Sequence, residues 1–415
     1  MRFGEEKMAL ELTIHRELGH LEPCYLRGPR HLFMKTNRAH VGPHVLAMSI
    51  ALLYLGCSSA TPATPGGMGG LSARLAAGTY HSLVVDGSGA LWSWGDEGAV
   101  GLDDPEAFRA APARSSLTGV AAVAAGSNHS MVLKDDGTVW TWGFARKGMG
   151  YGTGCTPERM AEPVQVMDDV ASVEAGQYVQ AQYVVRRDGT AFMLGSDCPQ
   201  NSDPDDRATW PVILESLGKV KMIAAGWEHA LALGEDGTVW GWGWSWGSAQ
   251  SAALGPDSMD MGTTPLRVPG LSGIVAVAAK GETSYALDDQ GAVWSWGAND
   301  FGELGDGTTE YRSTPTPIPG LKAVSIAAGI LSGAAIDAAG GLWVWGDNRN
   351  GGLGVNGGDA IVRPVKMPNL PTMVAVSASY HFLALTADGR VYSWGYDGDG
   401  GTRNTTTTTP TLMPL

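Results

Sequence analysis

Four histidines are the side chains of this sequence best suited to chemistry, because imidazole can transfer protons or ligate a metal near neutral pH. They are His81, His129, His229 and His381, and no other histidine follows residue 56. Each stands thirteen residues before a Trp of a Trp-x-Trp-Gly-like stretch. A catalytic or metal-binding histidine needs its own set of neighbours. We therefore predict that these four are structural, starting strands and bonding backbone groups.

The sequence contains no other motif typical of a catalytic site. There is no Gly-x-Ser-x-Gly, His-Glu-x-x-His or phosphate-binding loop pattern. We accordingly predict no catalytic residue, no metal and no cofactor.

The histidines belong to a unit that recurs seven times over residues 73–415. Each copy ends in a glycine, and the spacings between these glycines run from 48 to 54 residues; they are Gly95, Gly143, Gly195, Gly243, Gly297, Gly346 and Gly395. Self-similarity at such a period indicates a repeat architecture.

One repeat predicts four short strands. In the second copy these are VAAVAAG (120–126), HSMVL (129–133), TVWTWG (138–143) and the Pro-containing EPVQVM (162–167). The Asp-Gly turn favours a hairpin, and proline favours an edge strand. Seven such units predict an all-β, seven-bladed β-propeller of four-stranded antiparallel blades. A linear solenoid is the alternative.

Residue size assigns places within such a propeller. Alanine-rich first strands suit the crowded axis, and tryptophans suit the wider gaps between blades. We expect Trp140 and Trp294 to belong to this core.

The pattern A-A-G-x-x-H-S-x-x-L…D-G-x-V-W-x-W-G, followed by NDFGELGDGT (299–308) or NRNGGLG (348–354), resembles the regulator of chromosome condensation repeat family. The resemblance covers 73–415 and implies a seven-bladed propeller with histidine as the usual residue at its position. Three departures stand out. Repeat three has Phe-Met-Leu for Trp-x-Trp, and Lys280 and Ala378 replace the usual glycine.

The N-terminal part reads as an export signal. Residues 1–56 form a predicted signal region, whose apolar run 45–55 ends in Leu-Gly-Cys and resembles a bacterial lipobox. We expect lipidation at Cys57, with an ordinary signal peptide or a buried strand as alternatives. Met34 gives a better positively charged start than Met1. Residues 57–72, rich in Ser, Thr, Pro and Gly, form a flexible tether. Ser58 after the cysteine implies an outer-membrane lipoprotein or cell-surface protein.

Export leaves two cysteines in the predicted propeller, Cys155 and Cys198. An even pair in an oxidising compartment is a disulfide candidate, and two free thiols are the alternative. They lack the further ligands that a zinc site needs.

Charge limits the partners. Residues 57–415 carry 21 Lys and Arg against 37 Asp and Glu, a net charge of −16. This disfavours nucleic acid, whose phosphates need basic side chains. The negative charge also disfavours contact between the propeller and anionic lipid, so we expect membrane contact only through the lipid anchor.

The turns between first and second strands vary on a constant frame, and they share a face with the loops that follow Trp-Gly. Aromatic and polar side chains together are typical of binding surfaces. We predict a ligand-binding face made of Tyr80, Asn128, Tyr178, Trp227, Glu228, Trp244, Trp246, Glu282 and Tyr380. The alternative is that these aromatics only cap the propeller.

These observations predict a non-enzymatic, monomeric binding scaffold of the bacterial envelope, holding a protein or glycan on its aromatic face. The resemblance implies an alternative, a regulator or inhibitor of another enzyme, like the exchange factor or the β-lactamase inhibitors of that family. A hydrolase has no supporting set of residues.

Overall fold

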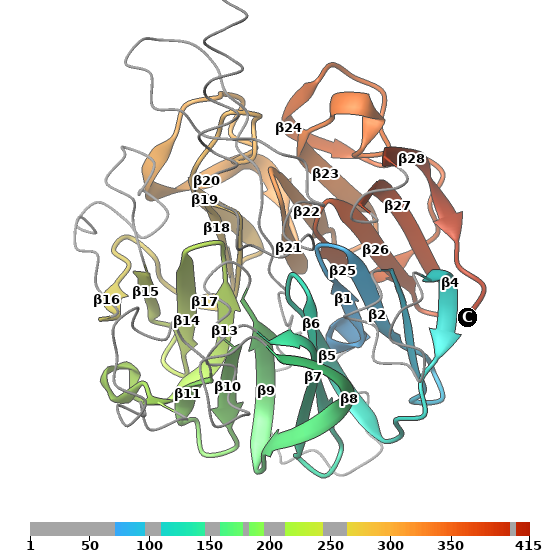
Figure 1. Cartoon of the computed structure of the whole chain (residues 1–415). Coiled ribbons are helices and arrows are strands. Elements are labelled where there is room, and N and C mark those ends of the chain that lie inside the picture. Colours follow the sequence, from blue (N-terminus) through green and yellow to red (C-terminus); the bar gives the residue numbers. More distant parts are fainter. Residues whose placement is uncertain are drawn as a thin grey trace, which may run out of the picture.

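The computed structural model describes residues 71–95, 109–145, 158–176, 182–194, 212–243, 264–398 and 404–415. These residues form seven sheets, each of four strands consecutive in sequence and paired antiparallel. The sheets are arranged as blades around one central axis (Figure 1). Helical structure in the described ranges is limited to 3-10 turns at Leu71–Arg74 (η2), Glu215–Leu217 (η3) and Arg349–Gly351 (η5). The predicted seven-bladed, all-β propeller is confirmed.

Blades 1 to 4 follow the chain in order. Their strands are β1 (Leu75–Ala77), β2 (His81–Val85), β3 (Leu91–Gly95), β4 (Arg109–Arg114); β5 (Val120–Ala125), β6 (His129–Lys134), β7 (Val139–Ala145), β8 (Glu158–Met167); β9 (Val170–Ala175), β10 (Gln182–Arg186), β11 (Ala191–Leu194), β12 (Val212–Ile213); and β13 (Val220–Ala225), β14 (His229–Gly234), β15 (Val239–Gly243), β16 (Leu266–Arg267).

Blades 5 to 7 complete the ring. Their strands are β17 (Ile274–Lys280), β18 (Thr283–Asp288), β19 (Ala292–Gly297), β20 (Arg312–Lys322); β21 (Ser325–Gly329), β22 (Ser332–Ile336), β23 (Leu342–Asp347), β24 (Ala360–Lys366); and β25 (Met373–Ala378), β26 (His381–Thr386), β27 (Val391–Gly398), β28 (Asn404–Leu412).

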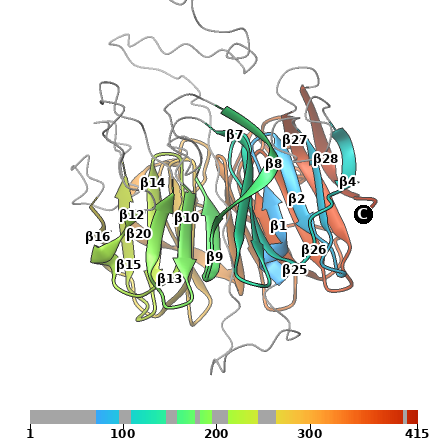
Figure 2. The same cartoon turned by 60° about the horizontal axis from the view of Figure 1, so that its bottom comes forward.

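The ring closes by packing between the first and last blades, since no strand is exchanged between them. In Figure 1 the blue strands β1 and β2 lie beside the red strands β25 and β26, and Figure 2 shows the same neighbours from another side. The Ala77 amide donates to Ser377 Oγ across this junction at 3.1 Å. Met413 and Leu415 pack against the apolar cluster that both blades share, so the C-terminal residues help to seal it.

The two tryptophans of each Trp-x-Trp differ in depth, although a two-residue step keeps them on one face of the strand. The second is buried between blades, as at Trp142, Trp296 and Trp345. The first is half-buried and its indole N–H reaches the Asp-Gly turn; Trp294 donates to Asp288 at 3.1 Å. Trp140 and Trp294, which were expected in the core, are half-buried, and Trp294 packs against the core cluster from its edge. The fully buried positions lie two residues later.

Repeat three fits the ring despite its departure from Trp-x-Trp. Phe192 and Leu194 occupy the tryptophan positions and are buried. The Arg186 guanidinium lies 5.0 Å from the Phe192 ring centre. The outer strand of this blade is short, with only Val212 and Ile213 paired.

Within the described ranges, no helix has the length and apolar character needed to span a bilayer.

Candidate functional site

Three of the four repeated histidines join neighbouring blades. Nε2 of the histidine in one blade shares a hydrogen bond with the hydroxyl of a serine that is the second residue of the second strand of the next blade. The pairs are His81 with Ser130 at 2.9 Å, His229 with Ser284 at 2.9 Å, and His381 with Ser82 at 2.8 Å. The histidines begin strands, as predicted. Their partner, however, is a side chain of the next blade and not the backbone, because blade packing brings that hydroxyl to the imidazole.

The environment of these histidines indicates a structural role. Burial lowers the pKa of His81 to about 3, with His129 and His381 adding to the shift, and lowers the pKa of His129 and His229 to about 4. The rings are therefore neutral at pH 7. A Cβ on Gly126 would lie 2.0 Å from His129 Cε1, which explains why the repeat pairs this glycine with a histidine three residues later. Nor do three or more His, Cys, Asp or Glu gather as a metal site in the described part of the chain.

The inner turns and the loops after the third strands share one face of the propeller, called the upper face below. Backbone bonds join them within blades: the amide of Ala298 donates to Glu282 O at 3.0 Å, and that of Tyr396 to Tyr380 O at 3.0 Å. Bonds also join neighbouring turns, from the Trp227 amide to Gly281 O at 2.7 Å and from the Ile330 amide to Ser379 O at 3.1 Å. The inner turns of blades 4 and 5, and those of blades 6 and 7, are thus fixed to each other.

Six of the residues predicted for the binding face lie in these turns and are half-buried: Tyr80, Asn128, Trp227, Glu228, Glu282 and Tyr380. The other three, Tyr178, Trp244 and Trp246, lie outside the described residues, as do Cys57, Cys155 and Cys198.

Aromatic side chains gather where blade 7 meets blade 1. The rings of Tyr380 and Tyr396 meet edge to face with centres 5.7 Å apart. Burial raises the pKa of the Tyr380 hydroxyl, and the nearby hydroxyls of Tyr80 and Tyr396 raise it further. Three tyrosines from the two blades therefore lie together. Tyr396 was not predicted for this face because it belongs to the extended third strand β27 and not to an inner turn.

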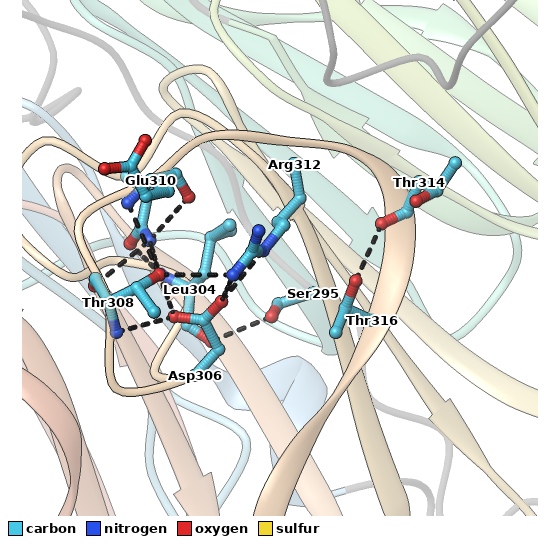
Figure 3. A network of polar contacts seen from close by, with 9 residues as sticks. Ser295, Leu304, Asp306, Thr308, Glu310, Arg312, Thr314 and Thr316 are labelled. Atoms are coloured by element: carbon cyan, nitrogen blue, oxygen red, sulfur yellow. Dashed lines mark hydrogen bonds and ion pairs between the residues drawn. The ribbon is translucent and has the colours of Figure 1, made fainter.

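Loop 298–311 of blade 5 is held by a dense polar network (Figure 3). Asp306 accepts from the Thr308 amide at 2.8 Å and pairs with Arg312 at 2.9 Å. The Asn299 amide group donates to the Glu310 carbonyl at 2.9 Å, and its oxygen accepts from the Leu304 amide at 2.9 Å. This loop is a rigid part of the upper face.

Loop 347–359 of blade 6 uses the same device. The Asn348 side chain donates to Gly358 O at 3.1 Å and accepts from the Leu353 amide at 3.2 Å. The N-x-x-G-x-L-G spacing shared by the two loops was the signal in the sequence for this role. Asp347 and Arg349 form a bidentate pair, with Nη2 to Oδ2 at 2.7 Å, and the Arg349 guanidinium lies 4.1 Å from the Phe301 ring centre. The two loops are therefore in contact.

A buried lysine connects the two positions where the usual glycine of the repeat is missing. Lys280 is fully buried and its Nζ donates to the Ala378 carbonyl at 2.5 Å. Burial lowers the pKa of Lys280 well below its usual value, and Glu174 opposes this shift. The Glu174 carboxylate accepts from the Ala225 amide at 3.0 Å. The lysine thus ties blade 5 to blade 7 at the two positions where glycine is missing.

Comparisons with known proteins agree with this architecture. Models of the Regulator of chromosome condensation (RCC1) repeat match residues 290–336 and 339–385, and, in a second version, residues 120–148, 220–248, 274–303 and 374–400. No curated protein matches the chain.

Two solved structures show the same fold. Prp20p from Saccharomyces cerevisiae, studied for its binding to Gsp1p and histones, is 22% identical, with 78% of this chain and 84% of that chain covered and a TM-score of 0.65. Human WBSCR16 is 21% identical, with 79% and 94% covered and a TM-score of 0.66. With the seven observed blades and the repeat matches, we conclude that the chain belongs to the regulator of chromosome condensation (RCC1) repeat family.

Proposed function

We propose that this protein is a non-enzymatic binding scaffold whose upper face holds a protein or glycan partner. The observation that carries the proposal is the set of half-buried aromatic side chains on the inner turns of the upper face. Tyr80 and Tyr380 lie near each other where blades 1 and 7 meet, and Trp227 lies on a turn whose amide bonds to the inner turn of blade 5. Rigid aromatic side chains bury large area with little loss of conformational entropy, which makes them effective anchors. Protein binding by the yeast relative supports the same class of function. Regulation of a bound enzyme would use the same face.

The partner should depend on these anchors. The full chain serves as bait in an envelope extract, and the captured partner is then titrated with variants. We expect Trp227→Ala and Tyr80→Ala each to weaken binding by about 2 kcal/mol, roughly thirtyfold, since each removes a central aromatic anchor. The thermal melt should change little, because both side chains are already half-exposed. Glu235→Ala, in an exposed Asp-Gly turn of the opposite face, is the control. Equal affinity of the wild-type and anchor variants, with a loss in the control, would place the partner on the wrong face for this proposal.

We also propose that the protein is a lipid-anchored component of the cell envelope. The support is the apolar run that ends in Leu-Gly-Cys57, followed by the 57–72 tether. Mass spectrometry of membrane-extracted protein is expected to show a chain beginning at acylated Cys57, and Cys57→Ser should release it from the membrane fraction. An unmodified chain that retains residues 45–56 would contradict the anchor.

A further inference from the structure

Two Asn-Gly pairs occur in the sequence, Asn350-Gly351 and Asn356-Gly357, and both lie in loop 347–359 of the upper face. Such pairs carry their own chemistry, because glycine has no Cβ to shield its backbone nitrogen. A glycine nitrogen that is free of other contacts can reach the carboxamide carbon of the asparagine before it. Both asparagines are exposed, so the state of the glycine nitrogen distinguishes the two pairs.

The first pair is held in place. The Gly351 amide belongs to the 3-10 turn η5 and donates to the Asn348 carbonyl at 2.8 Å. Asn350 has a φ of 60°, in the left-handed region. A Cβ on Gly351 would lie 3.0 Å from Thr408 Cγ2, so this glycine packs closely against strand β28. Its nitrogen is therefore engaged by the turn and must leave a hydrogen bond before it can react.

The second pair is not held. Asn356 and Gly357 are both exposed, and among the described residues neither the Asn356 side chain nor the Gly357 amide makes a hydrogen bond. The residues on either side are fixed, since the carbonyls of Val355 and Gly358 accept from Asn348 Nδ2 at 3.3 Å and 3.1 Å. The pair is thus the unbonded tip of an anchored loop, open to water.

A bonded glycine amide recurs elsewhere in the propeller, which makes the state of Gly357 distinctive. In the Asp-Gly turns of the opposite face, Gly137, Gly189 and Gly237 each donate to the carbonyl three residues earlier, at 2.9, 2.9 and 3.1 Å. Gly351 makes the same bond. Gly357 follows an exposed asparagine without making it.

We propose that Asn356 is a site of spontaneous deamidation, a covalent modification that needs only water. The Gly357 nitrogen loses its proton to hydroxide and attacks Cγ of Asn356. The new carbon–nitrogen bond closes a succinimide ring, and the side-chain nitrogen leaves as ammonia. One water molecule then opens the ring at either carbonyl and leaves aspartate or isoaspartate. No group is oxidised or reduced in either step.

The modification changes the upper face without a change of sequence. Both products place a carboxylate where the loop had a neutral amide, and the isoaspartyl form also adds a methylene to the backbone. That extra length falls between Val355 and Gly358, whose carbonyls share the Asn348 side chain. The same loop carries the Asp347–Arg349 pair. This inference is independent of the proposed partner.

The test incubates the purified full chain in mildly alkaline buffer, folded in one sample and unfolded by urea in the other. Trypsin cleaves after Arg349, so one peptide contains both asparagines and its fragment spectra report on each. In the folded chain we expect the mass gain of about 1 Da to accumulate roughly tenfold faster at Asn356 than at Asn350, the factor for one backbone hydrogen bond that must first open. In urea the two rates should converge, because both pairs have the same chemistry.

Two variants complete the design. Asn356→Gln should abolish the product at that position, because the longer side chain has to close a larger ring. The matched control, Asn350→Gln, should leave the rate at Asn356 unchanged. Equal rates at the two asparagines of the folded chain would overturn the inference. So would a folded chain that stays unmodified at Asn356 over a period in which the unfolded chain reacts at both positions.

Discussion

Trp345→Ala is expected to lower the free energy of unfolding by about 3–5 kcal/mol, the range for deleting a large buried aromatic side chain. Trp345 is fully buried between blades 5 and 6, and its indole N–H donates to the Glu303 carbonyl at 2.7 Å. Its ring also meets Tyr285 edge to face at 5.8 Å. Truncation therefore opens a cavity between two blades and removes a support of loop 298–311.

Trp343→Ala is the matched control, because it lies on the same strand, β23, two residues earlier. Trp343 is half-buried and donates to Asp337 at 2.9 Å, so its loss should cost only about 1–2 kcal/mol, the value of one hydrogen bond with partial burial. Urea unfolding followed by circular dichroism measures both variants. Equal destabilisation by the two substitutions would refute the distinction between inner and outer tryptophans.

Stability is expected to fall by about 6 kcal/mol between pH 6.5 and 4.5, because the buried histidines must stay neutral in the native state. All four repeated histidines have folded pKa values of about 3 to 4 against 6.5 when exposed. In this window the unfolded chain binds up to about four more protons through them, so stability rises with pH. Glu303, whose pKa is raised to about 8, keeps one proton in the native state and opposes the trend.

The slope of stability against pH tests this account. The net difference of about three protons corresponds to roughly 4 kcal/mol per pH unit. His229→Gln should reduce the slope by about 1.4 kcal/mol per pH unit, since one titrating group is removed. Urea unfolding at half-unit pH steps measures both chains. A stability that stays level from pH 6.5 to 4.5 would contradict neutral buried histidines.

The fold could be predicted because the same four-strand pattern occurs seven times in the sequence. Strand starts at His129 and Val120 agree with the expected ranges, and Pro163 lies in the outer strand β8, as proline requires. The pattern could not predict how deeply each side chain of a blade is buried. Trp343 and Trp345 have the same residue type and the same facing, and only blade packing buries one of them.

The candidate site was predictable in part. Inner turns were placed from strand direction alone, which identified Tyr80, Trp227, Glu282 and Tyr380. Phe301 and Glu303 were missed, because loops of irregular backbone carry no periodic signal. Tyr396 was missed because strand β27 continues past the Trp-Gly position where the repeat unit was taken to end. Asn299 and Asn348 decide the shape of those loops through side-chain bonds, and such bonds become visible only in three dimensions.

By itself the sequence determined the number of blades, their strand order and the face that varies, because short-range periodicity and turn chemistry are local properties. The tertiary structure alone decided which groups meet across blade boundaries. It places His81 in a hydrogen bond with Ser130, 49 residues away, and Lys280 in a hydrogen bond with the Ala378 carbonyl, 98 residues away. It also left the Glu303 carboxyl buried beside Asp300. Burial, and with it pKa and partner choice, depends on the closed ring, because each blade is covered only by its neighbours.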